Sequence, residues 1–247
     1  DSKMSATTDG GLTFGADLDL DEAGKIAGSE TTNQGTTVFI SGDWGTLPLG
    51  DTDGAADKVT LGMDTGNAGS IDDSETAHGG FQESYLDGGF DGQILRYDYS
   101  FDALTFALSF EQNDATDNDD DLGWAIGFGY MFEFSGGSAN VSVAYQEVDA
   151  FTFGAFNKAN VVDDDKAFDI ALEDVADLDE ATHTGIALGY TFDDFTISAN
   201  YGTYHFSDND DIVVEGWGLA AAYDLGGGAS IKAGYGSSTL DDDGILS

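Results

Sequence analysis

The chain lacks several features that would have identified other classes of protein. It has no cysteine, one proline (Pro48) and only 7 lysine and arginine residues among 247. Without cysteine it has no disulfide framework and no thiolate chemistry. The few bases against 48 acidic residues give a formal net charge of -41, which repels the phosphate backbone, so we expect no nucleic-acid partner. No stretch approaches the roughly 18 consecutive apolar residues of a membrane-spanning helix.

What the chain has instead is a strict alternation of large and small side chains. Residues 122–134 carry a large apolar residue at every second position, and Gly123, Ala125, Gly127 and Gly129 stand between them. Successive side chains of a β-strand point to opposite faces, so one face is apolar and the other nearly bare. A soluble sheet needs polar residues on its far face. Large outside and small inside is typical of a sheet that faces lipid and closes around water.

The same alternation recurs in other segments, and acidic loops separate them. We predict twelve strands, at about 3–8, 11–20, 35–41, 46–50, 93–100, 104–112, 122–134, 138–149, 182–192, 195–206, 212–224 and 229–238. Their connections alternate between tight turns, rich in Gly and Asp, and longer loops at 21–34, 51–92, 113–121, 150–181 and 207–211. Outer-membrane barrels show this asymmetry, with short periplasmic turns and long external loops.

These observations predict an all-β fold, a transmembrane antiparallel β-barrel formed as one domain by residues 1–247. We expect 14–16 strands in the complete barrel, with at least the first and last missing from this chain, and segment 150–181 could hold another hairpin. The alternative is a soluble acidic β-protein, halophilic or calcium-binding. Small closed barrels fill their interior with side chains, and the inner faces here are too small for that.

Four segments resemble the general diffusion porins of Gram-negative outer membranes, most closely the alpha-proteobacterial type. They are residues 8–16 (TDGGLTFGA), 37–42 (TVFISG), 95–100 (LRYDYS) and 218–230 (GLAAAYDLGGGAS). The resemblance covers most of the chain. The chain departs from the family in the terminal strands that we expect to be missing, in a shorter 150–181 region and in its low arginine count.

The resemblance implies an outer-membrane homotrimer, in contact with lipid and lipopolysaccharide, whose pores pass small hydrophilic solutes by passive diffusion. It further implies that loop 51–92 folds into the lumen and forms a constriction, and a loop of this length is typical of a functional one. The constriction residues would be Asp64, Asp72, Asp73, Glu75, Glu83, Asp87, Arg96 and Asp98. The lumen bases facing them would be Lys3, Lys58 and Lys232.

Strand parity places Arg96 opposite Leu95 and Tyr97, and hence in the lumen. Because bases are scarce and the loop is acidic, we predict a cation-preferring pore, as acidic rings select cations.

We expect no enzyme activity and no obligatory cofactor. The three histidines, His78, His183 and His205, lie far apart in the sequence, and their spacing suggests no zinc site. Carboxylates are too abundant for any pair to indicate catalysis. Calcium is a possible ligand, because Asp117, Asp119 and Asp121 supply clustered oxygen atoms, although the glycine spacing of an EF-hand is not met.

Overall fold

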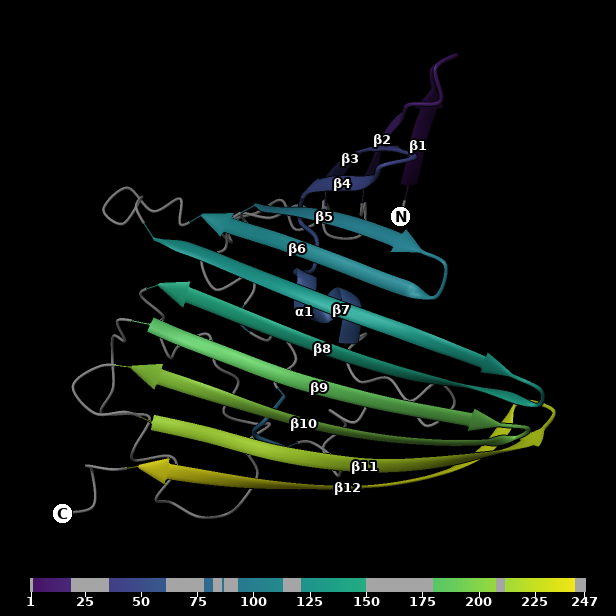
Figure 1. Cartoon of the computed structure of the whole chain (residues 1–247), viewed down its shortest axis with the longest axis vertical. Helices are drawn as coiled ribbons and strands as arrows, with labels where there is room; N and C mark the ends of the chain where they lie inside the picture. The colour runs from purple at the N-terminus through teal and green to yellow at the C-terminus, as the bar shows by residue number, and fades with distance from the viewer. Residues whose placement is uncertain are drawn as a thin grey trace, which may run out of the picture.

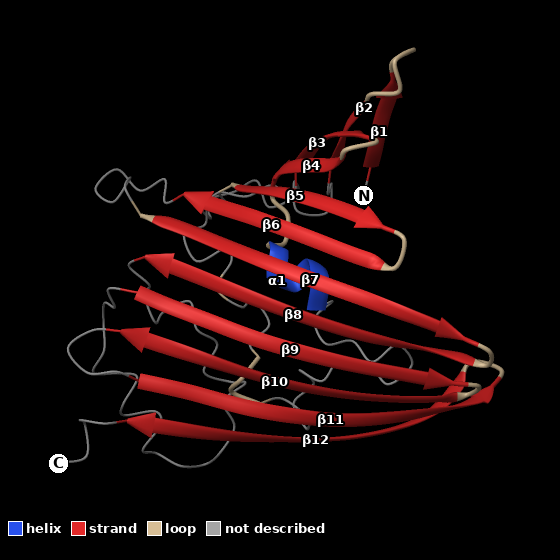
Figure 2. Cartoon of the chain, in the orientation of Figure 1, coloured by secondary structure: helices blue, strands red, loops and turns tan. Residues whose placement is uncertain are grey.

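The computed structural model describes residues 2–18, 36–60, 78–81, 86, 93–112, 121–149, 180–207 and 212–242. These residues form twelve strands and one short helix (Figures 1 and 2). The strands form a single antiparallel sheet in which each one pairs with its neighbours in sequence. The helix in the described ranges is too short to cross a membrane.

The strands lengthen along the chain. The first four are β1 (Ser2–Thr7), β2 (Thr13–Leu18), β3 (Thr36–Gly42) and β4 (Gly45–Gly50), and helix α1 (Ala55–Thr60) follows them. The next four are β5 (Ile94–Phe101), β6 (Leu104–Gln112), β7 (Leu122–Phe134) and β8 (Gly137–Asp149). The last four are β9 (Glu180–Phe192), β10 (Phe195–Ser207), β11 (Ile212–Gly226) and β12 (Ala229–Asp242).

The twelve predicted strands are confirmed, with differences at their ends. Strand β2 begins at Thr13 because Thr8 and Leu12 close a turn through hydrogen bonds, and Gly11 in that turn has a φ of 84°. Strand β12 runs to Asp242 because its pairing with β11 continues to Ile212. The sequence between Ser237 and Asp242 is too polar to show apolar alternation, so the prediction ended early. The suggested hairpin within 150–181 and the total of 14–16 strands stay predictions, since 150–179 lie outside the described residues.

Tight turns connect the strands at one end of the sheet, on the right of Figure 1. Asp102 and Asp193 adopt φ values of 54° and 48°, a region that aspartate tolerates better than most residues. Gly136 and the run Gly226–Gly228 fill similar positions with positive φ. The connections at the opposite end are the long ones, so the predicted asymmetry between the two ends is confirmed.

The outer face of the sheet is apolar and exposed. Leu188, Leu219 and Ile231 expose 49%, 48% and 62% of their surface, and the large residues of β7 lie on the same face. Aromatic rings at strand ends next to the short turns are exposed too, among them Trp44, Phe101, Phe192 and Tyr223. Contiguous apolar surface of this extent is uncommon on soluble monomers and suits contact with lipid or a neighbouring subunit.

Candidate functional site

The inner face carries a row of small residues that crosses six strands. Paired in register from β6 to β11, the row consists of Ala107, Gly127, Ala144, Gly185, Gly202 and Gly216. We call this set the small-residue row; it continues at Asp98 on β5 and Ser238 on β12. Two described pieces of loop 51–92 lie on it, as the loop's predicted position in the lumen requires.

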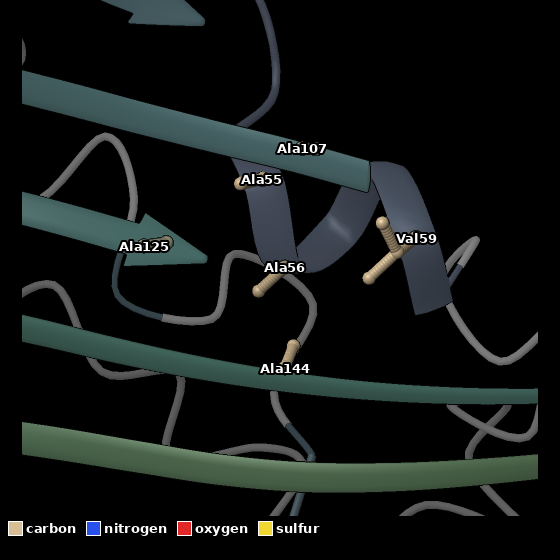
Figure 3. Close-up of a cluster of buried hydrophobic side chains, with 6 residues drawn as sticks. All are labelled: Ala55, Ala56, Val59, Ala107, Ala125 and Ala144. Atoms are coloured by element: carbon tan, nitrogen blue, oxygen red, sulfur yellow. The ribbon is translucent and has the colours of Figure 1, made fainter. Parts of the chain in front are cut away.

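The first piece is α1, which lies on β6, β7 and β8. Ala55, Ala56 and Val59 of the helix form a buried cluster with Ala107, Ala125 and Ala144 (Figure 3). The Ser109 hydroxyl accepts a hydrogen bond of 2.9 Å from the Ala55 N–H and so satisfies one donor at the start of the helix. A Cβ added to Gly127 would meet Val59 Cγ1 at 3.0 Å and the Ala55 carbonyl oxygen at 2.8 Å. Close approach of the helix therefore requires glycine at this position.

Arg96 anchors the chain just before α1. Its guanidinium donates to both carboxylate oxygens of Asp98, at 2.7 and 3.1 Å, in a bidentate ion pair. On its other side Nη1 donates to the Thr52 hydroxyl at 3.2 Å and to the Asp53 carbonyl oxygen. Only 7% of Arg96 is exposed. The geometry is that of a tether between β5 and the start of the loop.

The second piece is His78–Phe81, which lies on β9 to β12. His78 Nε2 is 2.8 Å from Asn200 Oδ1, and the Gly79 N–H donates to the Ser238 hydroxyl at 2.7 Å. His183 Nε2 lies 2.9 Å from the Gly80 carbonyl oxygen. Beyond this segment, Leu86 is fully buried and lines a small cavity with Ile94, Ser109, Glu111, Gln146 and Val148.

The structure places some of the predicted site residues. Register puts Lys3, Arg96, Asp98 and Lys232 on the inner face, and Lys58 is exposed on α1. Lys3 pairs with Asp17 at 2.8 Å. Asp64, Asp72, Asp73, Glu75, Glu83, Asp87, Asp117 and Asp119 lie outside the described residues; Asp121 is described. The described residues contain no cluster of three metal-ligating side chains. The constriction and calcium assignments stay predictions.

One expectation needs correction. The bare face of 122–134 does not simply line water, because Gly123, Ala125 and Gly127 are buried, Ala125 and Gly127 beneath α1 and Gly123 at the Leu86 cavity. The structure also brings two of the histidines together, because His78 and His183 both contact Gly80 and Phe81. Sequence reasoning also missed Asn200. The signal that the sequence did contain is the small residue at the same depth of each successive strand, which marks where the loop can approach the wall.

An antiparallel sheet with an apolar outer face, a small and polar inner face and an inserted loop defines a membrane-spanning channel of the outer-membrane type. The profile of the Gram-negative porin family matches residues 1–243, and the chain belongs to this family. It is therefore an outer-membrane channel protein and not an enzyme.

Individual relatives support the same family. A porin from Rhodobacter capsulatus is 30% identical over an alignment of 276 residues, which covers 98% of this chain and 87% of that protein. A solved porin structure refined at 1.8 Å superposes with a TM-score of 0.53 at 24% identity, over 97% of this chain and 86% of the other. The trimer form of OmpT, an outer membrane protein of Vibrio cholerae, gives a TM-score of 0.65 at 13% identity, over 98% and 69%. The last two show likeness of fold.

Proposed function

We propose that the chain forms a cation-preferring pore for small hydrophilic solutes. The observation that carries this proposal is the pairing of the wall bases: Arg96 with Asp98 and Lys3 with Asp17. An ion pair presents almost no net charge to a passing solute. Among the described bases, Lys58 and Lys232 remain without an ion pair inside the described ranges, whereas the whole chain carries 48 acidic residues.

Reversal potentials in a potassium chloride gradient across a planar bilayer test the preference. We expect the wild-type potential to have the sign of potassium selectivity, and Lys232→Gln to increase it because an inner-face positive charge is lost. Lys3→Gln/Asp17→Asn is the matched control: it removes both partners of the 2.8 Å ion pair, so the net charge stays the same and the selectivity should remain that of the wild type. Anion selectivity of the wild type would refute the proposal.

We further propose that the protein assembles as a homotrimer through β1–β4. Of these strands, β4 is bounded by described residues on both sides, and its 6 residues are fewer than the roughly 9–11 that a tilted strand needs to cross a bilayer. On the outer face of β1–β3, Met4, Phe14 and Val38 are exposed by 56%, 50% and 47%. A protein neighbour would cover this apolar surface beside a strand that is too short to match lipid. The trimer form of OmpT supports the stoichiometry.

The assembly is tested by substituting Phe14→Glu in the centre of this surface and measuring mass in detergent by light scattering. We expect loss of the trimer, because a charge is costly in an apolar interface. Leu188→Glu, on the outer face of β9, is the matched control: it should perturb membrane insertion and leave the oligomer mass unchanged. A monomeric wild type would contradict the proposal.

A further inference from the structure

The segment His78–Phe81 is seated in a groove that only glycine permits. A Cβ at Gly80 would lie 2.6 Å from the Gly216 carbonyl oxygen, and a Cβ at Gly216 would lie 2.8 Å from the Gly80 nitrogen. A Cβ at Gly202 would collide with the Gly80 carbonyl group. Three glycines from the loop, β10 and β11 thus bring backbone against backbone. The segment can occupy this position only while its hydrogen bonds hold it there.

Those hydrogen bonds define the protonation state of His78. The Gly80 N–H donates to His78 Nδ1 at 3.2 Å, so Nδ1 must be unprotonated. The proton of the neutral ring is therefore on Nε2, which donates to Asn200 Oδ1 at 2.8 Å. Only 1% of His78 is exposed. If Nδ1 were protonated, its N–H and the Gly80 N–H would be two donors facing each other, with no acceptor between them.

Packing around Phe81 joins His78 to the wall. The Phe81 ring meets His78 edge to face at 5.9 Å and His183 edge to face at 5.2 Å between ring centroids. His183 in turn stacks on Tyr204 at 4.1 Å. Release of His78 would therefore disturb the contacts of Phe81 as well, and the four residues would leave the wall together.

We propose that His78–Phe81 is a proton-sensitive latch that holds this segment on β9–β12, with neutral His78 as its positioning residue. Protonation of Nδ1 removes the acceptor of the Gly80 N–H and frees the segment to move from the wall into the water path, which lowers conductance. The groups facing the latch are His183 from β9, Asn200 from β10, Gly216 from β11 and Ser238 from β12; His183 is the one that titrates. The inference does not depend on cation preference, because its readout is conductance.

The direction of the pH effect follows from burial. Burial lowers the pKa of His78, which lies outside the strands, below its ordinary 6.5, and the hydrogen bond from His78 to Asn200 offsets part of the shift. The released state keeps the ordinary pKa and so binds a proton more readily than the latched state. The latch has its full strength above 6.5 and loses it as pH falls from 6.5 through the lowered pKa.

Single-channel conductance in planar bilayers tests the latch. Between about pH 7.5 and about pH 5.5 we expect the wild-type conductance to fall about twofold, because a histidine changes its charge in this window while ordinary carboxylates stay ionised. His78→Gln should give a flat profile, since glutamine cannot gain a charge. His205→Gln is the matched control, because His205 lies on the opposite face from the inner-facing Tyr204, and it should keep the wild-type profile. A flat wild type, or a His78→Gln profile that still falls, would overturn the proposal.

A disulfide provides a second test in the same assay. A Cβ at Gly79 would lie 3.5 Å from Ser238 Cβ, at the short end of the roughly 3.5–4.5 Å that a disulfide spans. It would also lie 2.7 Å from Val214 Cγ1, so the Val214 side chain must shift to admit it. The chain has no other cysteine to compete. Oxidised Gly79→Cys/Ser238→Cys should lose the pH response, and dithiothreitol should restore it. A locked channel whose conductance still falls with pH would refute the latch even if His78→Gln failed to assemble.

Discussion

Replacing Arg96 distinguishes a tether from a constriction charge. If Arg96 acts as a tether, the planar, branched shape of its guanidinium matters, because the group reaches Asp98 on one side and Thr52 and Asp53 on the other. Lysine keeps the charge but has a single ammonium group, which cannot serve both sides at once. A charge in the constriction would instead be preserved by lysine. Arg96→Lys is therefore the informative change, and Arg96→Ala is its reference.

The magnitude follows from the bonds that each variant loses. Arg96→Lys forfeits the two contacts of one side, and hydrogen bonds to a charged group contribute about 1.5–3 kcal/mol each, so we expect a loss of about 3 kcal/mol or more. Arg96→Ala leaves the Asp98 carboxylate, whose side chain is 19% exposed, without its partner. Breaking a buried ion pair in this way costs about 3–5 kcal/mol. Lys232→Ala, which removes an exposed inner-face base, should change stability by less than about 0.5 kcal/mol.

The assay is urea unfolding of the protein folded into lipid vesicles, combined with conductance of the same samples. A cycle with Asp98→Ala isolates the pair: the double variant should be no less stable than Arg96→Ala, because the unpaired carboxylate is gone. If Arg96→Lys unfolds and conducts like the wild type, the tether interpretation is wrong and Arg96 acts through its charge alone.

Three further predictions address the loop and its acids. Gly127→Ala should destabilise the fold by about 1–3 kcal/mol and change conductance, because α1 must shift. Gly129→Ala should leave stability and conductance nearly unchanged, since its Cβ would meet nothing closer than 3.8 Å. Equal effects of the two substitutions would contradict the docking of α1. Asp72→Asn/Asp73→Asn should reduce the cation preference in reversal-potential measurements, and unaltered selectivity would remove these residues from the constriction. If Asp117, Asp119 and Asp121 bind calcium, EDTA should lower the melting temperature of the assembly, and an unchanged melting curve would refute the site.

Most of the sheet could be predicted because each strand carries its own signal. In β7 the large residues face outward and the small ones inward, so parity alone assigns every side chain to a face. Arg96 and Lys232 were placed on the inner face in the same way. The contacts of the loop could not be predicted, since they depend on which position along each distant strand the loop residues reach. His78 and Asn200 are 122 positions apart, and no local spacing indicates their hydrogen bond.

The small-residue row also changes what the bare inner face means for the channel. Small residues on a channel wall suggest a wide lumen, yet two pieces of loop 51–92 occupy the row, α1 at Gly127 and Gly80 at Gly202 and Gly216. The space that these glycines leave on the inner face is therefore occupied by the loop rather than by water. At these positions the described pieces of the loop, rather than the wall side chains, therefore form the inner surface. A methyl group added to the row should change conductance more than a methyl group added elsewhere on the inner face.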